Sequence, residues 1–297
     1  MKMRTIYQKL FLTHSYFTIA IRSRSENSIL SDPTFQPEYV MHAEVNRWAA
    51  DPFLVEDNGK TWLFYEAVEN NHGHIEVAEV LPNCSLGKPV VLLRDDCHYS
   101  YPFVFRWNNE WFMIPESSAA KEVRLYRAIE FPQKWMLQEV VLTERAVDTT
   151  VFERDGCLFL LTFLTDGKTE RVQPRMYSLL LSETGAELRA IDWKYYDELR
   201  VRGAGPVFLE KDKLYRPVQI NQEQRYGDAV AICQMSDQVS DYSEVIVNTI
   251  KTPIGKCFGL YVDGAHTYCQ SSKFEATDLR CRDFDFWKLP RKIFHHY

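Results

Sequence analysis

Residues 50–66 read ADPFLVEDNGKTWLFYE, and related stretches recur further along the chain. The stretch SYPFVFRWNNEWFMIPE at 100–116 aligns with the first without a gap. A third copy, VDTTVFERDGCLFLL, occupies 147–161, and a weaker fourth, AGPVFLEKDKLYRPVQ, occupies 204–219. Self-similarity at a period of about 50 residues is the signature of a repeat architecture.

Each copy predicts two β-strands joined by a tight turn. The pairs NG at 58–59, NN at 108–109 and DG at 155–156 favour hairpin turns, because Asn, Asp and Gly tolerate a positive φ. Further strand-like sequence follows each hairpin, for example at 73–80 and 122–128. We therefore expect one propeller blade of three or four strands per repeat. Little helix is expected, since no long segment shows a period of 3.6 residues.

Two pieces of the chain remain outside the four copies. The segment GAHTYC at 264–269 can supply inner strands for a fifth blade, and YFTIAIR at 16–22 is an orphan strand ahead of the first repeat. Pairing the orphan strand with the last blade would close the ring and remove an open sheet edge. The prediction is an all-β chain that forms a single five-bladed β-propeller domain over residues 1–297. Strand 16–22 closes the ring, and the blades are expected to start near residues 48, 98, 146, 202 and 257.

Composition narrows the classes of partner and compartment. The 297 residues are 45% hydrophobic and 14% aromatic, enough for a large core. The formal net charge is -6 and Lys and Arg are scattered, so no nucleic-acid partner is expected. The seven cysteines show no CxxC spacing, which predicts neither a zinc site nor a disulfide scaffold. With no signal-peptide pattern and no apolar run of about 18 residues, we expect a cytoplasmic protein without a membrane span.

A series of motifs resembles a known module. The motifs are WAADPF at 48–53, HYSYPF at 98–103, IPES at 114–117, FPQKW at 131–135, VDTT at 147–150, RPVQ at 216–219 and GAHT at 264–267. Together they resemble the propeller module at the N-terminal part of plant glucosamine inositolphosphorylceramide transferases, over residues 16 to 278. Similar modules occur in bacterial surface-polysaccharide gene products, some fused to formyltransferases. The resemblance implies a carbohydrate ligand and a glycosyltransferase or formyltransferase as a partner.

That module in turn resembles the five-bladed propellers of glycoside hydrolase families 43 and 32. The resemblance to family 43 implies that Asp51 is the general base and that Asp148 is the second aspartate, which tunes the pKa of the acid. The general acid of that family is a glutamate at the position of Ala204 in this chain. The expected acid is therefore missing here, and Glu116 is the best candidate to replace it. In the plant transferases, the resemblance assigns glycosyl transfer to a separate C-terminal domain.

A propeller brings residues far apart in sequence to one pocket, because the innermost strands all begin near one end of the channel. Glycoside cleavage needs two carboxylates, one ionised and one protonated, and neighbouring acids push their pKa values apart. We predict catalytic roles for Asp51, Glu116 and Asp148. Asp51 would activate water and Glu116 would protonate the leaving oxygen. Turn chemistry for Asp51 and Asp148, in which each caps its own strand entry, remains the structural alternative.

Eight further residues are predicted to bind substrate. Aromatic side chains can stack on sugar faces, guanidinium groups can bind a carboxylate or phosphate, and the histidines can line the pocket. These residues are Trp48, His98, Tyr101, Arg202, Arg216, Gln219, Tyr226 and His266. Ion pairing of the arginines with the three acids is an equal alternative, and a metal held by both histidines and an aspartate is a further one.

No phosphate loop, nucleophile elbow or HExxH helix occurs in the chain, so no cofactor is expected. The function indicated is a carbohydrate-active protein, glycoside hydrolase-like (a glycosidase or transglycosylase), acting on a surface or capsular glycan. The absent acid at Ala204 favours the alternative, a non-catalytic carbohydrate-binding or accessory module of a glycan-modifying transferase system. The sequence leaves the choice between an enzyme and a binding module open.

Overall fold

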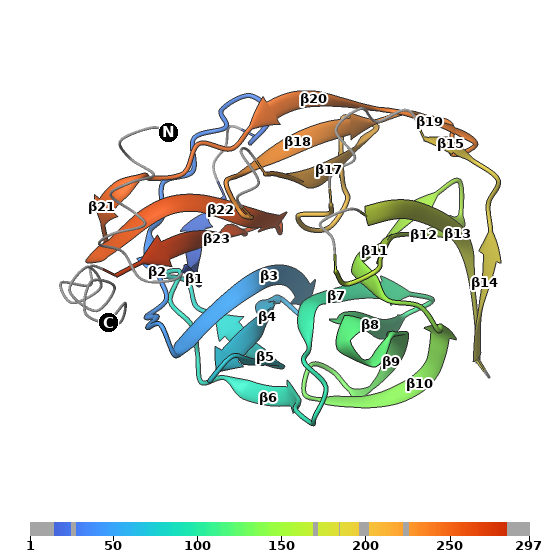
Figure 1. Cartoon of the computed structure of the whole chain (residues 1–297), viewed down its shortest axis with the longest axis horizontal. Coiled ribbons are helices and arrows are strands. Elements are labelled where there is room, and N and C mark those ends of the chain that lie inside the picture. The colour runs from blue at the N-terminus through green and yellow to red at the C-terminus, as the bar shows by residue number, and fades with distance from the viewer. Residues whose placement is uncertain are drawn as a thin grey trace, which may run out of the picture.

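The computed structural model describes residues 15–24, 28–168, 172–183, 185–195, 202–221 and 226–283. Five sheets stand around a central axis, and the predicted all-β, five-bladed propeller is confirmed (Figure 1). Within these ranges the helical structure is a single 3₁₀ turn at Ser118–Ala120. The described part of the chain contains no helix with the length and apolar character needed to cross a membrane.

Four blades are antiparallel sheets of four strands each. Blade I comprises β3 (Arg47–Asp57), β4 (Lys60–Glu69), β5 (His72–Val80) and β6 (Val90–Leu93). Blade II comprises β7 (Ser100–Trp107), β8 (Glu110–Ser117), β9 (Glu122–Glu130) and β10 (Lys134–Leu142). Blade III comprises β11 (Ala146–Arg154), β12 (Cys157–Thr165), β13 (Val172–Ser182) and β14 (Gly185–Ala190). Blade IV comprises β16 (Phe208–Glu210), β17 (Lys213–Ile220), β18 (Ala229–Met235) and β20 (Glu244–Thr249).

Blade V joins the two ends of the chain. Its strands, in spatial order, are β2 (Tyr39–Val40), β1 (Tyr16–Ser23), β23 (Phe274–Arg282), β22 (Leu260–Gln270) and β21 (Gly255–Cys257). Strand β1 pairs antiparallel with β23 from Tyr16↔Cys281 to Ser23↔Phe274. The predicted closure of the ring by the N-terminal strand is therefore confirmed. A parallel pair, β15 (Lys194–Tyr195) and β19 (Asp241–Tyr242), stands outside the five blades (Figure 1).

The predicted hairpin turns form where the sequence places them. The residues at 58–59, 108–109 and 155–156 all have a positive φ, between 48° and 77°. Left-handed residues at both central positions of a two-residue turn match the right-handed twist of the flanking strands. The Asn, Asp and Gly side chains at these positions therefore set the register of the three innermost hairpins.

A second irregularity recurs near the start of the inner strands. The ladders of β3, β7, β11 and β22 each contain a register shift that leaves two residues unpaired. The first unpaired residue in β3, β7 and β11 is Asp51, Tyr101 or Asp148, with φ of 52°, 44° and 51°. Such bulges bend a strand and re-aim its side chains. The bulge in β22 leaves His266 unpaired in the same way.

Candidate functional site

A cavity of about 230 Å³ lies where the bulged residues of the inner strands converge. Eight of the eleven residues predicted from the sequence line it: Trp48, Asp51, His98, Glu116, Asp148, Arg202, Tyr226 and His266. Four lining residues were not predicted: Phe17, Ala50, Glu66 and Ser100. The cavity is smaller than the sites of drug-sized ligands (~300–1,000 Å³), so it suits one small polar ring.

The structure places the other three predicted residues in the core around blade IV. The hydroxyl of Tyr101 accepts the backbone N–H of Gly205 at 2.8 Å. The guanidinium of Arg216 is buried and forks onto Glu244, with N···O distances of 2.6 and 2.7 Å. Gln219 is buried and donates to a backbone carbonyl of blade IV at 2.8 Å. These side chains brace the blade and do not line the cavity.

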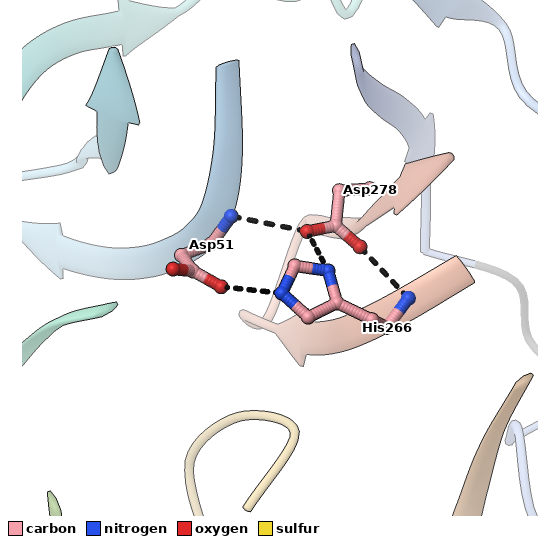
Figure 2. A group of neighbouring side chains, drawn as sticks. All are labelled: Asp51, His266 and Asp278. Atoms are coloured by element: carbon pink, nitrogen blue, oxygen red, sulfur yellow. Dashed lines mark hydrogen bonds and ion pairs between the residues drawn. The ribbon is translucent and has the colours of Figure 1, made fainter. Parts of the chain in front are cut away.

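His266 bridges two aspartates from different blades (Figure 2). Its Nε2 lies 3.1 Å from Oδ1 of Asp51, and its Nδ1 lies 2.6 Å from Oδ2 of Asp278. Burial lowers the pKa of His266, but the two carboxylates outweigh burial and raise that pKa to about 10. Burial raises the pKa of Asp278, and the charge and hydrogen bonds of His266 outweigh it, so that the net shift is downward. The buried trio is therefore an imidazolium held between two carboxylates.

The same trio is a donor set that could hold a cation. One donor atom from each of Asp51, His266 and Asp278 lies within 4.8 Å of the others. Metal binding would require His266 to lose a proton from one ring nitrogen, and both nitrogens face carboxylates. The imidazolium already compensates one of the two carboxylate charges. The structure pairs His98 with Glu66, so the two histidines that the sequence suggested as joint ligands belong to separate groups.

Arg202 joins two of the predicted catalytic acids. Its guanidinium forks onto Asp148 at 2.7 and 2.8 Å, and Nη2 lies 3.8 Å from Oε2 of Glu116. Glu116 also accepts the hydroxyl of Ser118 at 2.8 Å and the backbone N–H of Asp148 at 3.3 Å. Burial raises the pKa of Glu116 to about 7 against the opposing charge of Arg202. Burial also raises the pKa of Asp148, again opposed by Arg202.

The pKa of Glu66 is also raised. Its Oε1 lies 3.1 Å from Nε2 of His98, and its carboxyl is buried. Burial raises the pKa of Glu66 to about 7, opposed by the hydrogen bond from His98. The sequence held a signal for this residue, because Glu66 occupies the position in the first repeat that Glu116 occupies in the second. Phe17 and Asp278 had no such signal, since both lie on strands outside the four aligned copies.

The carboxylates also tie neighbouring blades together. The backbone N–H of Asp51 donates to Asp278 at 3.1 Å, and that of Tyr101 donates to Asp51 at 3.0 Å. The backbone N–H of Asp148 donates to Glu116 in the same manner. Each link runs from a bulged residue to an acid of the preceding blade. The acids therefore have a structural role in addition to facing the cavity.

Aromatic rings form part of the wall. Phe17 lies 5.8 Å from Trp48 and 6.2 Å from Tyr226, measured between ring centroids. Phe17 also lies 4.5 Å from His266, and the Arg202 guanidinium sits 5.5 Å above the ring of Tyr226. Tyr226 as a residue is 43% exposed. The cavity thus combines aromatic faces with carboxylates.

Ala204 lies outside the cavity. It is wholly buried in an apolar cluster with Tyr268, and its carbonyl accepts the N–H of Tyr268 at 2.7 Å. The next residue, Gly205, passes so close to blade V that an added Cβ would lie 1.9 Å from the Tyr268 carbonyl oxygen. Any proton donor in this cavity must therefore come from another position.

A family model and a sequence relative match this chain. Residues 21–257 match the family model for glucosamine inositolphosphorylceramide transferase 1, N-terminal. Glucosamine inositolphosphorylceramide transferase 1 of Oryza sativa subsp. indica is 31% identical over 211 residues, which is 68% of this chain and 28% of that protein. The chain thus spans little more than a quarter of the length of this relative.

Solved structures show the same architecture in glycan-processing enzymes. A GH43_1 enzyme from Xanthomonas citri, in complex with xylotriose, matches 81% of this chain and 88% of its own, with a TM-score of 0.56 at 12% identity. The GH32 β-fructofuranosidase of Bombyx mori matches 71% of this chain and 53% of its own, with a TM-score of 0.52 at 14% identity. At these identities the likeness shows the fold. Its sequence relatives and the matched model show that the chain belongs to the family of the N-terminal region of glucosamine inositolphosphorylceramide transferase 1.

Proposed function

We propose that this chain is a carbohydrate-active protein whose cavity binds one sugar unit of a surface or capsular glycan and promotes cleavage or transfer at its glycosidic bond. The observation that carries the proposal is the pairing of two kinds of carboxyl group in one cavity. Asp51 is ion-paired with His266, whereas burial raises the pKa of Glu66 and of Glu116 to about 7. One ionised and one protonated carboxyl group are what glycoside chemistry needs.

In this proposal each side chain has a distinct task. Asp51 accepts a backbone N–H through its second oxygen, so it acts as a carboxylate that takes a proton from the attacking water. A glutamate with a raised pKa gives a proton to the leaving oxygen, and Glu116 is the candidate that the sequence identifies. Asp148, held by the fork of Arg202, presents oxygen atoms to the sugar hydroxyls. Tyr226 and Trp48 supply ring faces for the sugar.

A second candidate function is a non-catalytic glycan-binding module that accompanies a glycosyltransferase or formyltransferase. Two observations favour it. Ala204 stands where the resemblance to family 43 expects the acid, and the cavity carboxylates also link the blades. The relative's name describes a transferase, and this chain spans 28% of it, so the module's contribution there would be recognition of the glycan.

A glycan-array screen followed by incubation of the bound glycans tests the proposal. Wild type is compared with Asp51→Asn and with Asp237→Asn, a matched substitution of an exposed aspartate. We expect all three proteins to bind the same glycans, and only wild type and Asp237→Asn to release product. Binding by wild type with no product would favour the non-catalytic module. Turnover by Asp51→Asn at the wild-type rate would contradict the role of Asp51.

A further inference from the structure

Glu66 and His98 form a pair that runs from the cavity to solvent. Glu66 belongs to β4 of blade I and is 5% exposed, whereas His98 precedes β7 of blade II and has a side chain that is 43% exposed. Oε1 of Glu66 and Nε2 of His98 are 3.1 Å apart. The pair therefore connects a buried carboxyl group in the cavity with a half-exposed imidazole at its rim.

The tautomer of His98 follows from its second contact. The backbone N–H of Gly73 donates to Nδ1 of His98 at 3.0 Å. An N–H donor requires a lone pair on that nitrogen, so the single proton of the neutral ring lies on Nε2 and points at Glu66. The hydrogen bond with Glu66 raises the pKa of His98, but a second ring proton would place two N–H groups against each other at Gly73. His98 is therefore a neutral donor to Glu66.

Gly73 is needed for this arrangement because of space. A Cβ at position 73 would lie 2.5 Å from Oε1 of Glu66, 2.6 Å from the carbonyl oxygen of Tyr99 and 2.9 Å from Cε1 of His98. The backbone thus passes directly against both members of the pair. Its amide can then fix the orientation of the imidazole, as a backbone group does for many functional histidines.

Glu66 is better placed than Glu116 to carry a transferable proton. Glu116 accepts the Ser118 hydroxyl and the Asp148 N–H, and it lies near the charge of Arg202. All three contacts favour its ionised form. Oε1 of Glu66 accepts the Nε2–H of the neutral His98. The second oxygen of Glu66 accepts no hydrogen bond from the described part of the chain. That second oxygen is free to meet a ligand in the cavity, which Glu66 lines.

We propose that Glu66 is the proton donor of this site and that His98 is the positioning residue that holds it. The proposal rests on the proposed function. As the glycosidic C–O bond breaks, the leaving oxygen takes the proton of Glu66. The oxygen of the attacking water bonds to the anomeric carbon, and Asp51 takes one proton from that water. Nε2–H of His98 then stabilises the new Glu66 carboxylate. Solvent returns a proton to Glu66, and Asp51 releases its own to solvent.

A carboxyl titration tests the first half of the proposal without any substrate. The full chain is labelled with ¹³C at the glutamate carboxyl groups and followed by NMR between pH 4 and 9. The titratable groups that face Glu66 are His98, Asp51 and His266. We expect the signal that Glu66→Gln removes to titrate near pH 7, and the ¹⁵N spectrum of His98 to show a proton on Nε2 alone. A Glu66 signal that titrates below about pH 5 would overturn the proposal.

The dependence of kcat/KM on the leaving group tests the second half of the proposal, the transfer of a proton from Glu66. The probes are 2,4-dinitrophenyl glycosides, which need no acid, and 4-methylphenyl glycosides, which do, each made with glucosamine, galactose and xylose. We expect Glu66→Gln to lower kcat/KM on the methylphenyl probes by about 10²–10⁴-fold and on the dinitrophenyl probes by less than about 10-fold. His98→Phe should follow the same pattern more weakly, whereas Glu116→Gln should lower both equally.

The outcomes separate this proposal from the proposed function. Equal losses on both probes in Glu66→Gln, with wild type active, would overturn the role of Glu66 and leave the function standing. Absence of turnover by wild type on every probe would overturn the proposed function, and with it the role of Glu66 as donor, whatever the titration shows.

Discussion

The bulged residues near the start of three inner strands hold an unusual backbone conformation. Asp51, Tyr101 and Asp148 have a positive φ, which costs roughly 1–3 kcal/mol for a residue other than glycine. Each of them donates its backbone N–H to a carboxylate of the cavity or behind it. These hydrogen bonds offset the strain, so the same atoms stabilise the ring and aim the side chains of Asp51 and Asp148 at the cavity.

The charge of His266 predicts a pH dependence of stability. Its folded pKa of about 10 lies above the ordinary value of 6.5. The stability that it contributes is therefore fully present below about pH 6.5 and is lost as the pH rises through 10, a loss on the order of a few kcal/mol. Urea unfolding at several pH values should show this decline in wild type and a flatter profile in His266→Gln. An exposed histidine, His42, provides the control. Equal profiles for wild type and His266→Gln would contradict the ion-paired trio.

The fork of Arg202 on Asp148 predicts a strong coupling between the two side chains. Arg202→Gln leaves the Asp148 charge buried without its partner, and we expect a loss of roughly 2–4 kcal/mol in the free energy of unfolding. A double-mutant cycle with Asp148→Asn should return a coupling energy of about 1–3 kcal/mol. A coupling energy near zero would show that the ion pair contributes nothing, as for a surface pair.

Among the strands, the sequence predicted the features that depend on local chemistry. The hairpins at 58–59, 108–109 and 155–156 follow from residues that tolerate positive φ. The aligned position of Asp51 and Asp148 follows from the repeat. The bulge itself was not predicted, because it depends on the ladder and not on the identity of one residue. Tyr101, which shares this position, points into the core because its hydroxyl meets Gly205.

The close approach of blades IV and V predicts the effect of adding one methyl group. Gly205→Ala would place a Cβ 1.9 Å from the Tyr268 carbonyl oxygen, so the two blades must separate. We expect a loss of more than about 3 kcal/mol, beyond the usual cost of replacing glycine at positive φ. Gly156→Ala is the matched control, since Gly156 also has a positive φ but no atom lies within 4 Å of its added Cβ. Chemical denaturation of both variants measures the difference, and equal losses would show that blade contact is not the cause.

The site as a whole could be predicted only in part from the sequence. Blade geometry brings Asp51, Asp148 and His266 together, and the repeats reveal the shared position of Asp51 and Asp148. The contribution of Phe17 comes from the closing strand, and Asp278 lies one strand behind the cavity, so neither has a signature in the repeats. Arg216 was predicted for the site and lies outside it. Its partner Glu244 on β20 is apparent only once the sheet is formed.

Closure of the ring predicts how substitutions in β1 affect the whole fold. Strand β1 lies between β2 and β23, and Thr18 is fully buried within it. Thr18→Pro removes a ladder donor from an interior strand, and we expect a loss of about 3 kcal/mol or more. Val91→Pro on the outer strand β6 should cost far less. Guanidinium unfolding, followed by circular dichroism and tryptophan fluorescence, should show one transition at a lower midpoint for Thr18→Pro. A midpoint no lower than that of Val91→Pro would contradict a structural role for closure.

In the proposed function, the 230 Å³ cavity receives the sugar. The most direct test is a crystal structure of Asp51→Asn with an oligosaccharide selected on the glycan array. We predict a sugar ring inside the cavity, with its glycosidic oxygen within hydrogen-bonding distance of Glu66 and its hydroxyls near Asp148. The contradicting result is an oligosaccharide bound elsewhere with the cavity empty of sugar, for instance in the larger cavity of about 770 Å³ that Phe105, Glu153 and Leu214 line.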